Sequence, residues 1–327
     1  MEKTSKWRWG INRWFILLFI VLNIIGVKWF APVQPGIQVA PELLSKHPLF
    51  TLPVIGAFYL SNTITAMLLG DLILLLIAFS IRQATRSGSL VPTGIAGAME
   101  ALLEVLYNLT ESSAGKWVKN IFPWFATIML VVLVANIVKL IPGFETIGLL
   151  EVGEKHNFPI QELGGGWATL LPAIKGVEGG YILIPFFRGL STDLNFTLAL
   201  ALISVVMTQV IGFQAQKMNY FSKFFNFTTM FKKPFFGFMD FLVGLLETIS
   251  EFAKILSFAF RLFGNMFAGM VLVALIGVMV PWFVPSLVFM FEFFIGVIQA
   301  FVFGMLTMVF MAQATHGHGS EEHSEAE

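Results

Sequence analysis

The chain has 327 residues, of which 57% are hydrophobic and only 12% charged, and its formal net charge at pH 7 is zero. A water-soluble domain carries about 25% charged residues, so this composition excludes an ordinary soluble enzyme and predicts a surface that faces lipid. The neutral charge balance gives no indication of nucleic-acid binding, and the lack of cysteine excludes disulfides and thiolate metal sites.

Apolar runs long enough to cross a membrane recur along the chain, since one membrane-spanning helix takes about 20 residues. The first run, 14–30, follows four basic residues and lacks a small-residue cleavage site. We therefore expect a retained span rather than a cleaved signal peptide. Further spans are expected at 62–81, 121–141, 194–213 and 286–314, and a longer apolar run covers 235–280.

The segments between these runs differ in character. Residues 31–53 hold five prolines and are predicted to form an extended external segment. Residues 91–119 place apolar side chains opposite glutamates, which predicts an amphipathic helix along the membrane interface or packed on neighbours. Residues 145–188 are glycine-rich and polar with no clear periodicity, so we expect a long loop. The acidic, histidine-bearing tail 316–327 is expected to be disordered.

The distribution of basic residues orients the chain. With the N-terminus inside, 12 of the 20 Lys and Arg residues lie in inner segments and six in outer ones, in agreement with the positive-inside rule. Both termini are then cytoplasmic, which six crossings satisfy if 235–280 crosses once as a long tilted helix. The expected fold is an all-α integral membrane protein with an N-terminal span and external segment (1–60), a helical domain (61–315) with an outer loop (143–190), and the tail.

Arg261 is the most unusual residue of the long apolar run. An arginine deep in a membrane costs about 2.5–3.5 kcal/mol on insertion scales, and it cannot lose its proton to escape that cost. No carboxylate lies within four residues of Arg261 in the sequence. These facts favour a functional role for its charge.

Other polar residues continue the same helical face. Glu247 and Lys254 are spaced seven residues apart, as are Lys254 and Arg261, with Ser257 between them and Asn265 beyond. Glu251 is also placed to pair with Lys254. An internal salt-bridge network that holds helices together remains an equally good interpretation of Glu247 and Lys254.

The last apolar run carries Glu292 and Gln299, again seven residues apart. A carboxyl group buried in a helix bundle is harder to ionise, so it can exchange protons near neutral pH. A structural hydrogen-bonding pair explains the same two residues equally well.

Two aspartates in other runs have different expected roles. Asp71 lies in the middle of a span, where a charge facing lipid would be costly, so we expect it to face the protein interior. Asp193 begins a predicted helix with Asn195 close behind, and capping of that helix is the favoured interpretation.

Several motifs resemble one known family. Residues 258–269 read FAFRLFGNMFAG and closely resemble the signature of subunit a of bacterial F-type ATP synthases. Residues 298–303 (IQAFVF), 193–197 (DLNFT) and 136–143 (NIVKLIPG) are similar to other motifs of that family. The similarity covers residues 60–315, and the Arg-Leu-Phe-Gly-Asn element at Arg261 is highly specific.

The resemblance implies a non-catalytic, proton-translocating stator subunit of the bacterial plasma membrane. In such a subunit a long tilted helix pair packs against a ring of c subunits, and an essential arginine, here Arg261, separates two offset half-channels. Glu292 occupies the position of a relay group seven residues before Gln299, whereas Met270 stands where many members carry a second carboxylate. The remaining matches to family positions are Glu247, Lys254, Ser257, Asn265, Asp193 and Asn195.

The implied partners are the c ring, the b-subunit peripheral stalk, the other F-type ATP synthase subunits, protons and the lipid bilayer. No cofactor, metal or nucleic acid is implied. An alternative is a stand-alone cation or proton transporter or channel with a cationic gate, but such proteins usually show an internal repeat, and the 247–269 pattern occurs once. A quinone-linked respiratory subunit would need cofactor ligands or a partner chain, and the five histidines lie outside the apolar runs.

Overall fold

The computed structural model describes residues 9–29, 38–53, 56–86, 94–141, 143–153, 158–171, 180–224, 234–281 and 284–316. Its helices are α1 (Trp9–Trp29), α2 (Asn62–Arg86), α3 (Ile95–Ala114), α4 (Val118–Val138), α5 (Leu194–Gln216), α7 (Pro234–Met279) and α8 (Val284–Thr315), with short 3-10 helices η1 (Gly115–Trp117), η2 (Leu190–Thr192) and η3 (Lys217–Lys223). Five helical segments within the described residues are long and apolar enough to cross a membrane. The predicted helical integral membrane fold is confirmed.

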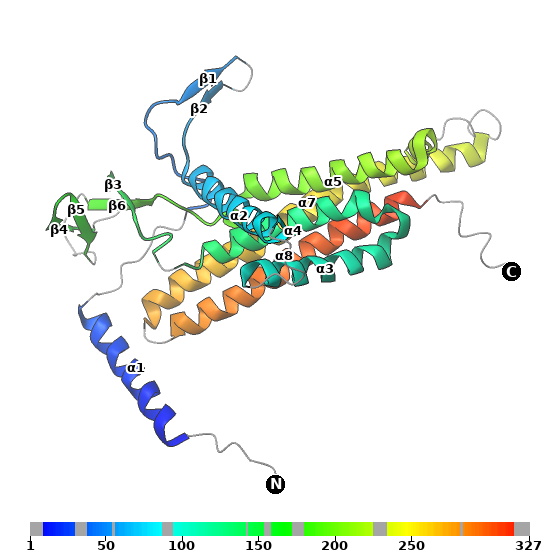
Figure 1. The fold of residues 1–327 in the computed structure, drawn as a ribbon. Helices are drawn as coiled ribbons and strands as arrows, with labels where there is room; N and C mark the ends of the chain where they lie inside the picture. Colours follow the sequence, from blue (N-terminus) through cyan, green and yellow to red (C-terminus); the bar gives the residue numbers. More distant parts are fainter. Residues whose placement is uncertain are drawn as a thin grey trace, which may run out of the picture.

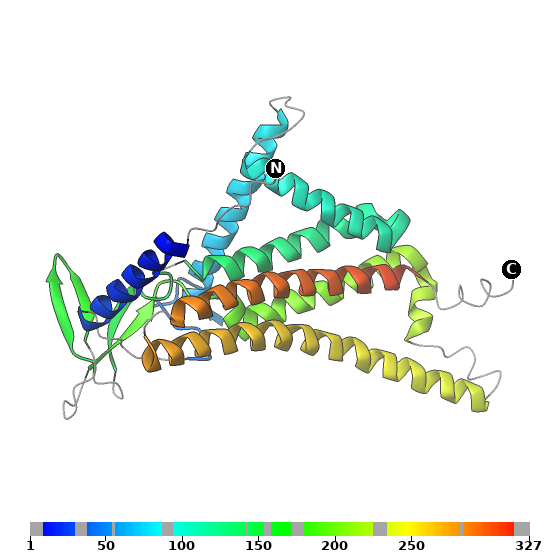
Figure 2. The same ribbon diagram turned by 90° about the horizontal axis from the view of Figure 1, so that it is seen from below.

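Four helices, α4, α5, α7 and α8, lie side by side and form the body of the molecule (Figure 1). Helix α2 crosses this bundle at an angle, and α1 lies apart from it (Figures 1 and 2). Helix α7 has 46 residues, so it is about 69 Å long, more than twice the ~30 Å hydrocarbon core of a bilayer. The prediction that 235–280 forms one long helix is confirmed, and its length requires that it tilt in the membrane or project from it.

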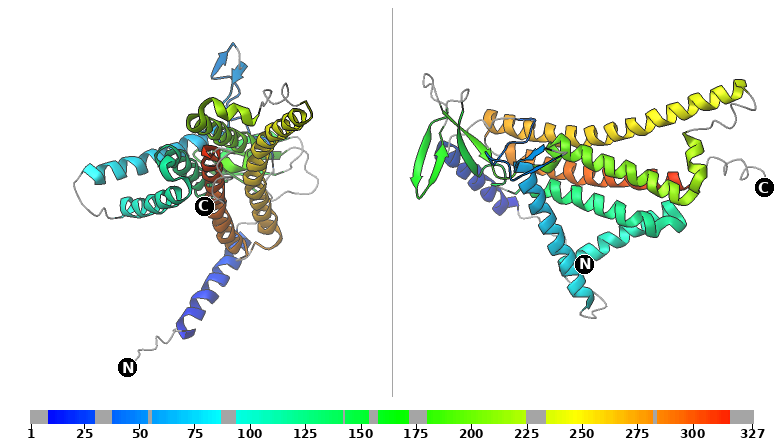
Figure 3. Two further views of the ribbon diagram at one scale, coloured as in Figure 1. Left: turned by 90° about the vertical axis from the view of Figure 1, so that its right-hand side faces the viewer. Right: turned by 90° about the horizontal axis from the view of Figure 1, so that it is seen from above.

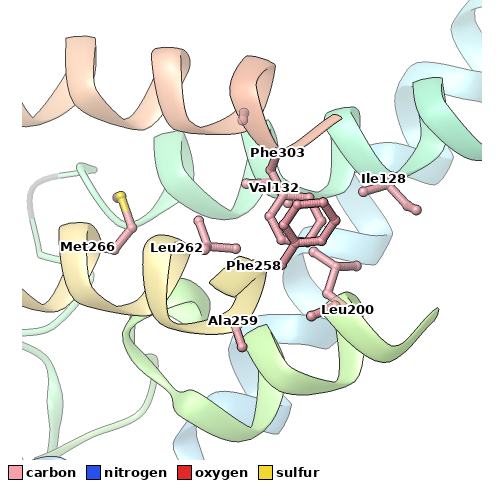
Figure 4. Packing of buried hydrophobic residues seen from close by; sticks show 10 residues of the cluster. Ile128, Val132, Leu200, Phe258, Ala259, Leu262, Met266 and Phe303 are labelled. Carbon is pink, nitrogen blue, oxygen red and sulfur yellow. The ribbon is translucent and has the colours of Figure 1, made fainter. Parts of the chain in front are cut away.

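A hydrophobic core fixes α7 against its three neighbours. Phe258 of α7 packs between Phe303 and Phe310 of α8, with ring centroids 5.3 Å and 5.6 Å away. Figure 4 shows this cluster, to which all four bundle helices contribute: Ile128, Val132, Leu200, Ala201, Phe258, Ala259, Leu262, Met266, Ala300 and Phe303. Because the buried side of α7 is defined by these contacts, its opposite side remains exposed.

Three antiparallel strand pairs, two of them hairpins, lie at one end of the bundle (Figure 3). They pair β1 (Phe50–Leu52) with β2 (Gly56–Phe58), β3 (Gly148–Gly153) with β6 (Gly180–Pro185), and β4 (Ile160–Gly164) with β5 (Trp167–Leu170). Helix α7 ends and α8 begins at this same end, here called the hairpin end, whereas α8 finishes at the opposite, tail end (Figure 2). Strands β3 to β6 thus lie at the end of the bundle opposite the end of α8, and their placement on the outer side of the membrane stays a prediction.

The expectation that 145–188 lacks regular structure is wrong. The residues on both sides of Gly164–Gly166 form the β4–β5 hairpin, and these glycines have φ of 88°, 66° and 84°, a region that favours glycine. Two short segments joined by a glycine turn are a hairpin signal that the overall glycine content obscured. The expectation of a disordered tail concerns residues that lie, after His316, outside the described part of the chain.

Helix α3 has the two faces that its sequence predicts. Leu106 is buried against α4 and α8, while Glu100 and Glu104 are exposed. The helix therefore packs on its neighbours, and its position at a membrane interface stays a prediction.

The expectation that Asp71 faces the protein interior is wrong within this chain, because its side chain is exposed. The buried residues of α2 are Asn62, Thr63, Ala66 and Gly70, at helical spacing along one stripe. Asp71 is one residue beyond Gly70, and a rotation of about 100° per residue carries it off that stripe. The angle at which α2 crosses the bundle leaves that side uncovered.

Candidate functional site

Arg261 lies on the exposed side of α7, about midway along the bundle. Its neighbour Leu262 is fully buried, so the packing of α7 directs Arg261 outward. Within the described part of the chain, Arg261 has no hydrogen bond or ion pair. Ser257 and Gly264 share its face and are also exposed, and a Cβ built on Gly264 meets no atom within 4 Å. The guanidinium thus lies on an open helix face lined by small residues.

Asn265, exposed on this same face, forms an amide pair that joins α7 to α8. The Asn265 Nδ2 donates to Gln299 Oε1 at 2.6 Å, and Gln299 is only 4% exposed. Gln299 Nε2 has no hydrogen-bond partner among the described residues. The structure therefore brings together two residues that the sequence placed on separate runs, one turn beyond Arg261.

A buried ion pair lies closer to the hairpin end. Lys139 Nζ donates to Glu292 Oε1 at 2.5 Å, and the two side chains are 4% and 5% exposed. Gly269 of α7 leaves room for Glu292, because a Cβ there would lie 2.9 Å from its Oε1. Sequence reasoning counted Lys139 among the outer basic residues and missed this contact. The available signal was a lysine inside the apolar run 121–141 rather than after it.

Glu145 extends this charged cluster. Its Oε1 accepts a hydrogen bond from the Gly189 backbone N–H at 2.9 Å. Burial raises the pKa of Glu145 above its ordinary value, a shift that the Gly189 hydrogen bond and the nearby Lys139 and Arg188 oppose and that Glu292 reinforces. The guanidinium of Arg188 is 5% exposed and donates to the backbone carbonyls of residues 38–40, which attaches the external segment to the bundle.

Asn136 links the elements around the ion pair. Its Nδ2 donates to the Gly296 carbonyl of α8 at 3.0 Å, and its Oδ1 accepts from Ser191 Oγ of η2 at 2.6 Å. Asn136 is 1% exposed, and an unpaired polar atom there would be costly. Both its amide nitrogen and its amide oxygen have partners. The motif at 136–143 therefore fixes the end of α4 against η2 and α8.

A second polar cluster lies toward the tail end. Lys254 Nζ forms its ion pair with Glu251 Oε1 at 2.8 Å, and it lies 4.8 Å from the centre of the Phe310 ring. Glu251 Oε2 also accepts from Gln209 Nε2 at 3.0 Å, and Tyr220 donates to Gln209 Oε1 at 2.6 Å. The predicted pairing of Glu251 with Lys254 is confirmed.

The remaining candidate residues have simpler surroundings. Asp193 caps α5 by accepting from the Asn195 backbone N–H at 2.9 Å, as its sequence context favoured, and Asn195 itself is exposed. Glu247 lies partly buried on α7, one turn before Glu251. No group of three or more His, Cys, Asp or Glu side chains suited to a metal occurs among the residues the structure describes.

These elements define a class of protein: a polytopic membrane protein with an exposed arginine that has no partner among the described residues. This arginine lies between two clusters of largely buried ionisable groups, one toward each end of the helix bundle. The chain belongs to the ATP synthase A chain family, whose model matches residues 61–312. The family resemblance carried by the motif around Arg261 is thereby confirmed.

Curated relatives support this assignment. The chain is 28% identical to the sodium-ion-specific ATP synthase subunit a of Propionigenium modestum over 306 residues, which cover 89% of both chains. It is 26% identical to ATP synthase subunit a of Moorella thermoacetica, with 76% of this chain and 88% of the relative covered. For subunit a of Helicobacter pylori strain Shi470 the identity is 28%, with 71% and 80% covered.

Proposed function

We propose that this chain is the proton-translocating stator subunit of an F-type ATP synthase, with no catalytic chemistry of its own. In this function Arg261 separates two offset half-channels, and each opens to one side of the membrane. The proposal rests on one observation: Arg261 is exposed on its helix face, and it has no partner among the described residues.

The cost of placing a guanidinium in the membrane explains why a second chain is needed. A charge that stays ionised in lipid requires a counter-charge. A carboxylate of a passing c subunit supplies one, and at about 4 Å with an effective dielectric near 20 the attraction is about 4 kcal/mol. Such an attraction favours release of the proton from the ring carboxyl and is small enough to be overcome as the ring turns.

The small residues on the Arg261 face support the proposed contact with the ring. Ser257, Gly264 and Ala268 are exposed on α7, and small side chains allow close approach of helices in membranes. The long helix α7 and its neighbour α8 are the proposed ring-facing pair. The b-subunit stalk and the other ATP synthase subunits are the remaining partners that family membership favours.

The two polar clusters support two separate paths. Glu292 lies near the start of α8, at the hairpin end, whereas Glu251 and Lys254 precede Arg261 on α7 and so lie nearer the tail end. In the proposed orientation in a bacterial plasma membrane, the hairpin end is outside and both termini are cytoplasmic. Protons then enter near Glu292 and leave near Glu251, while the positive charge of Arg261 opposes direct passage between the paths.

Replacement of Arg261 tests the proposal. In Arg261→Ala, ATP-driven acidification of inverted membrane vesicles is expected to disappear while the complex still assembles. Arg86→Ala serves as a control, because Arg86 is an exposed arginine at the end of α2. Acidification by Arg261→Ala at the wild-type rate would refute the proposal. The same assay without added sodium tests the choice of proton as the transported ion.

A further inference from the structure

The buried ion pair between Lys139 and Glu292 suggests a role for a residue that the family motifs did not single out. We propose that Lys139 is a positioning residue of the hairpin-end path: it holds Glu292 as an anion and moves to Glu145 when Glu292 accepts a proton. This inference rests on the proposed function, because it assumes that Glu292 lies on a proton path.

Lys139 is buried, so its positive charge needs a counter-charge. Its ammonium and the Glu292 carboxylate are almost fully removed from solvent and lie 2.5 Å apart. A buried ammonium without a counter-charge is strongly unfavourable. If Glu292 took up a proton while Lys139 stayed in place, the lysine would be left in that state. Proton uptake by Glu292 therefore requires that Lys139 find another anion.

Glu145 is that anion. A Cβ built on Gly189 would lie 3.1 Å from Lys139 Cδ and 3.3 Å from Glu145 Oε1, so both side chains converge on one point. Glu145 also interacts electrostatically with Lys139, Arg188 and Glu292, the charged groups that face it. The four-carbon stem of lysine lets the ammonium exchange partners by rotation, without backbone movement.

The other nearby cation is not free to make this movement. Arg188 donates to three backbone carbonyls of residues 38–40 and is 5% exposed. If the Arg188 guanidinium moved away, those three carbonyls would lose their hydrogen-bond donor. Among the described residues, Lys139 has one hydrogen-bond partner, Glu292, so its movement breaks one contact and forms an equivalent one.

The exchange adds one proton and one positive charge to the cluster and later releases both. An incoming proton converts the Glu292 carboxylate to a carboxylic acid, and the Lys139 ammonium, still protonated, pairs with the ionised Glu145. When Glu292 passes its proton toward the ring, Lys139 returns to it. Lys139 thus alternates between two carboxylates. While it pairs with Glu292, the ionised Glu145 keeps the hydrogen bond from the Gly189 N–H and the nearby charge of Arg188.

The test is the pH profile of proton uptake through the assembled membrane sector in proteoliposomes, driven by a valinomycin–potassium potential, with pH varied on the hairpin-end side. In Lys139→Gln the loss of the cation makes Glu292 take up protons at lower proton concentration. The half-maximal pH is then expected to rise by about 1–3 units, the range typical for one nearby opposite charge. Lys139→Arg retains the charge and is expected to keep the wild-type midpoint.

Two further variants complete the test. Glu145→Gln leaves the Lys139–Glu292 pair intact but removes the second partner, so uptake is expected to slow about tenfold, as for a barrier raised by about 1.4 kcal/mol. Glu151→Gln, an exposed β3 carboxylate paired with Lys46, is the matched control and is expected to match the wild type.

The outcomes separate the two proposals. If the half-maximal pH of uptake is unchanged in Lys139→Gln, the pair is only structural and the inference is overturned. If Lys139→Gln does not assemble, uptake at the wild-type rate in Glu145→Gln overturns the inference instead. Either result leaves the proposed function intact, since that depends on the loss of transport in Arg261→Ala measured in parallel.

Discussion

Asn265 and Gln299, which come from adjacent antiparallel helices, are joined by a 2.6 Å hydrogen bond one turn beyond Arg261. The bond uses the amide oxygen of Gln299 and leaves the amide nitrogen, Nε2, without a partner in the described part of the chain. A buried donor left unpaired costs about 1–3 kcal/mol, so its retention is unusual for a purely structural contact. The amide is therefore available to a group brought by a neighbouring chain or by water.

The first prediction separates packing from transport at this pair. Asn265→Leu should destabilise the complex by about 1–3 kcal/mol, because it leaves the buried Gln299 amide oxygen without its donor. Gln299→Leu should cost less, because the Asn265 amide that it leaves behind is exposed. The double variant Asn265→Leu/Gln299→Leu should recover most of that loss, since it leaves neither group behind. Thermal unfolding of the purified complex measures stability, and ATP-driven acidification measures transport.

If the pair serves only packing, the double variant should pump normally. We expect it to remain impaired by about tenfold or more despite recovered stability, which would place the amides on the translocation path. Full recovery of both properties would contradict that role.

A second prediction compares two glycines. In Gly304→Ala the new methyl would lie 2.8 Å from Met129 Cβ and 3.0 Å from Phe125, inside a packed core. Overpacking of this kind costs about 1–3 kcal/mol, which exceeds the gain of about 0.5–1 kcal/mol from replacing a helical glycine by alanine. Gly304→Ala should therefore lower the unfolding temperature.

Gly264→Ala is the matched variant, because its methyl meets nothing within 4 Å. It should leave the isolated chain as stable as the wild type or slightly more stable. Gly264→Leu should still fold but should block close approach of a ring helix, with a loss of coupled transport. Normal transport in Gly264→Leu would show that this face of α7 does not meet the ring.

The central part of the site was predictable because its signal is local. Arg261 has no carboxylate within helical reach in sequence, so its lack of a partner on its own helix follows from the sequence. The pairing of Lys254 with Glu251 follows equally from their three-residue separation. The long helix α7 follows from an apolar run without an interrupting proline.

The rest depends on contacts between distant segments. Lys139 and Glu292 are 153 residues apart, and only the packing of α4 on α8 reveals that a lysine assigned to an outer segment neutralises the candidate relay. The exposure of Asp71 likewise depends on the angle at which α2 crosses the bundle. The β3–β6 pair joins strands separated by more than 25 residues, a pairing that no local periodicity indicates.

A third prediction concerns the tail-end cluster. Glu251→Gln removes the anion between Lys254 and Gln209, and it leaves the Lys254 ammonium without its ion pair. Proton conduction started from the tail-end side should slow by about tenfold, with a stability loss of about 1 kcal/mol for this partly exposed pair. Glu104→Gln, on the exposed face of α3, is the control and should conduct normally. Equal conduction in both variants would remove Glu251 from the path.

The last prediction concerns pH-dependent stability at the hairpin end. Burial raises the pKa of Glu42 above its ordinary value, and the charge of Arg188 only partly opposes this shift. Because Glu42 is harder to ionise in the folded chain than in the unfolded one, it contributes most to stability when protonated. That contribution falls as pH rises from about 4.5 through the raised pKa.

Glu42→Gln keeps an amide that can hydrogen-bond to Asn62, which contacts Glu42 through two 3.2 Å hydrogen bonds, but it cannot ionise. As pH rises from about 4 to 7, the wild type should lose stability relative to Glu42→Gln. The unfolding temperature of the variant should therefore rise above that of the wild type and the difference should then level off. Glu162→Gln, on the exposed strand β4, should show a constant difference from the wild type over the same range. A flat profile for Glu42→Gln would mean that the external segment does not bury this carboxyl in solution.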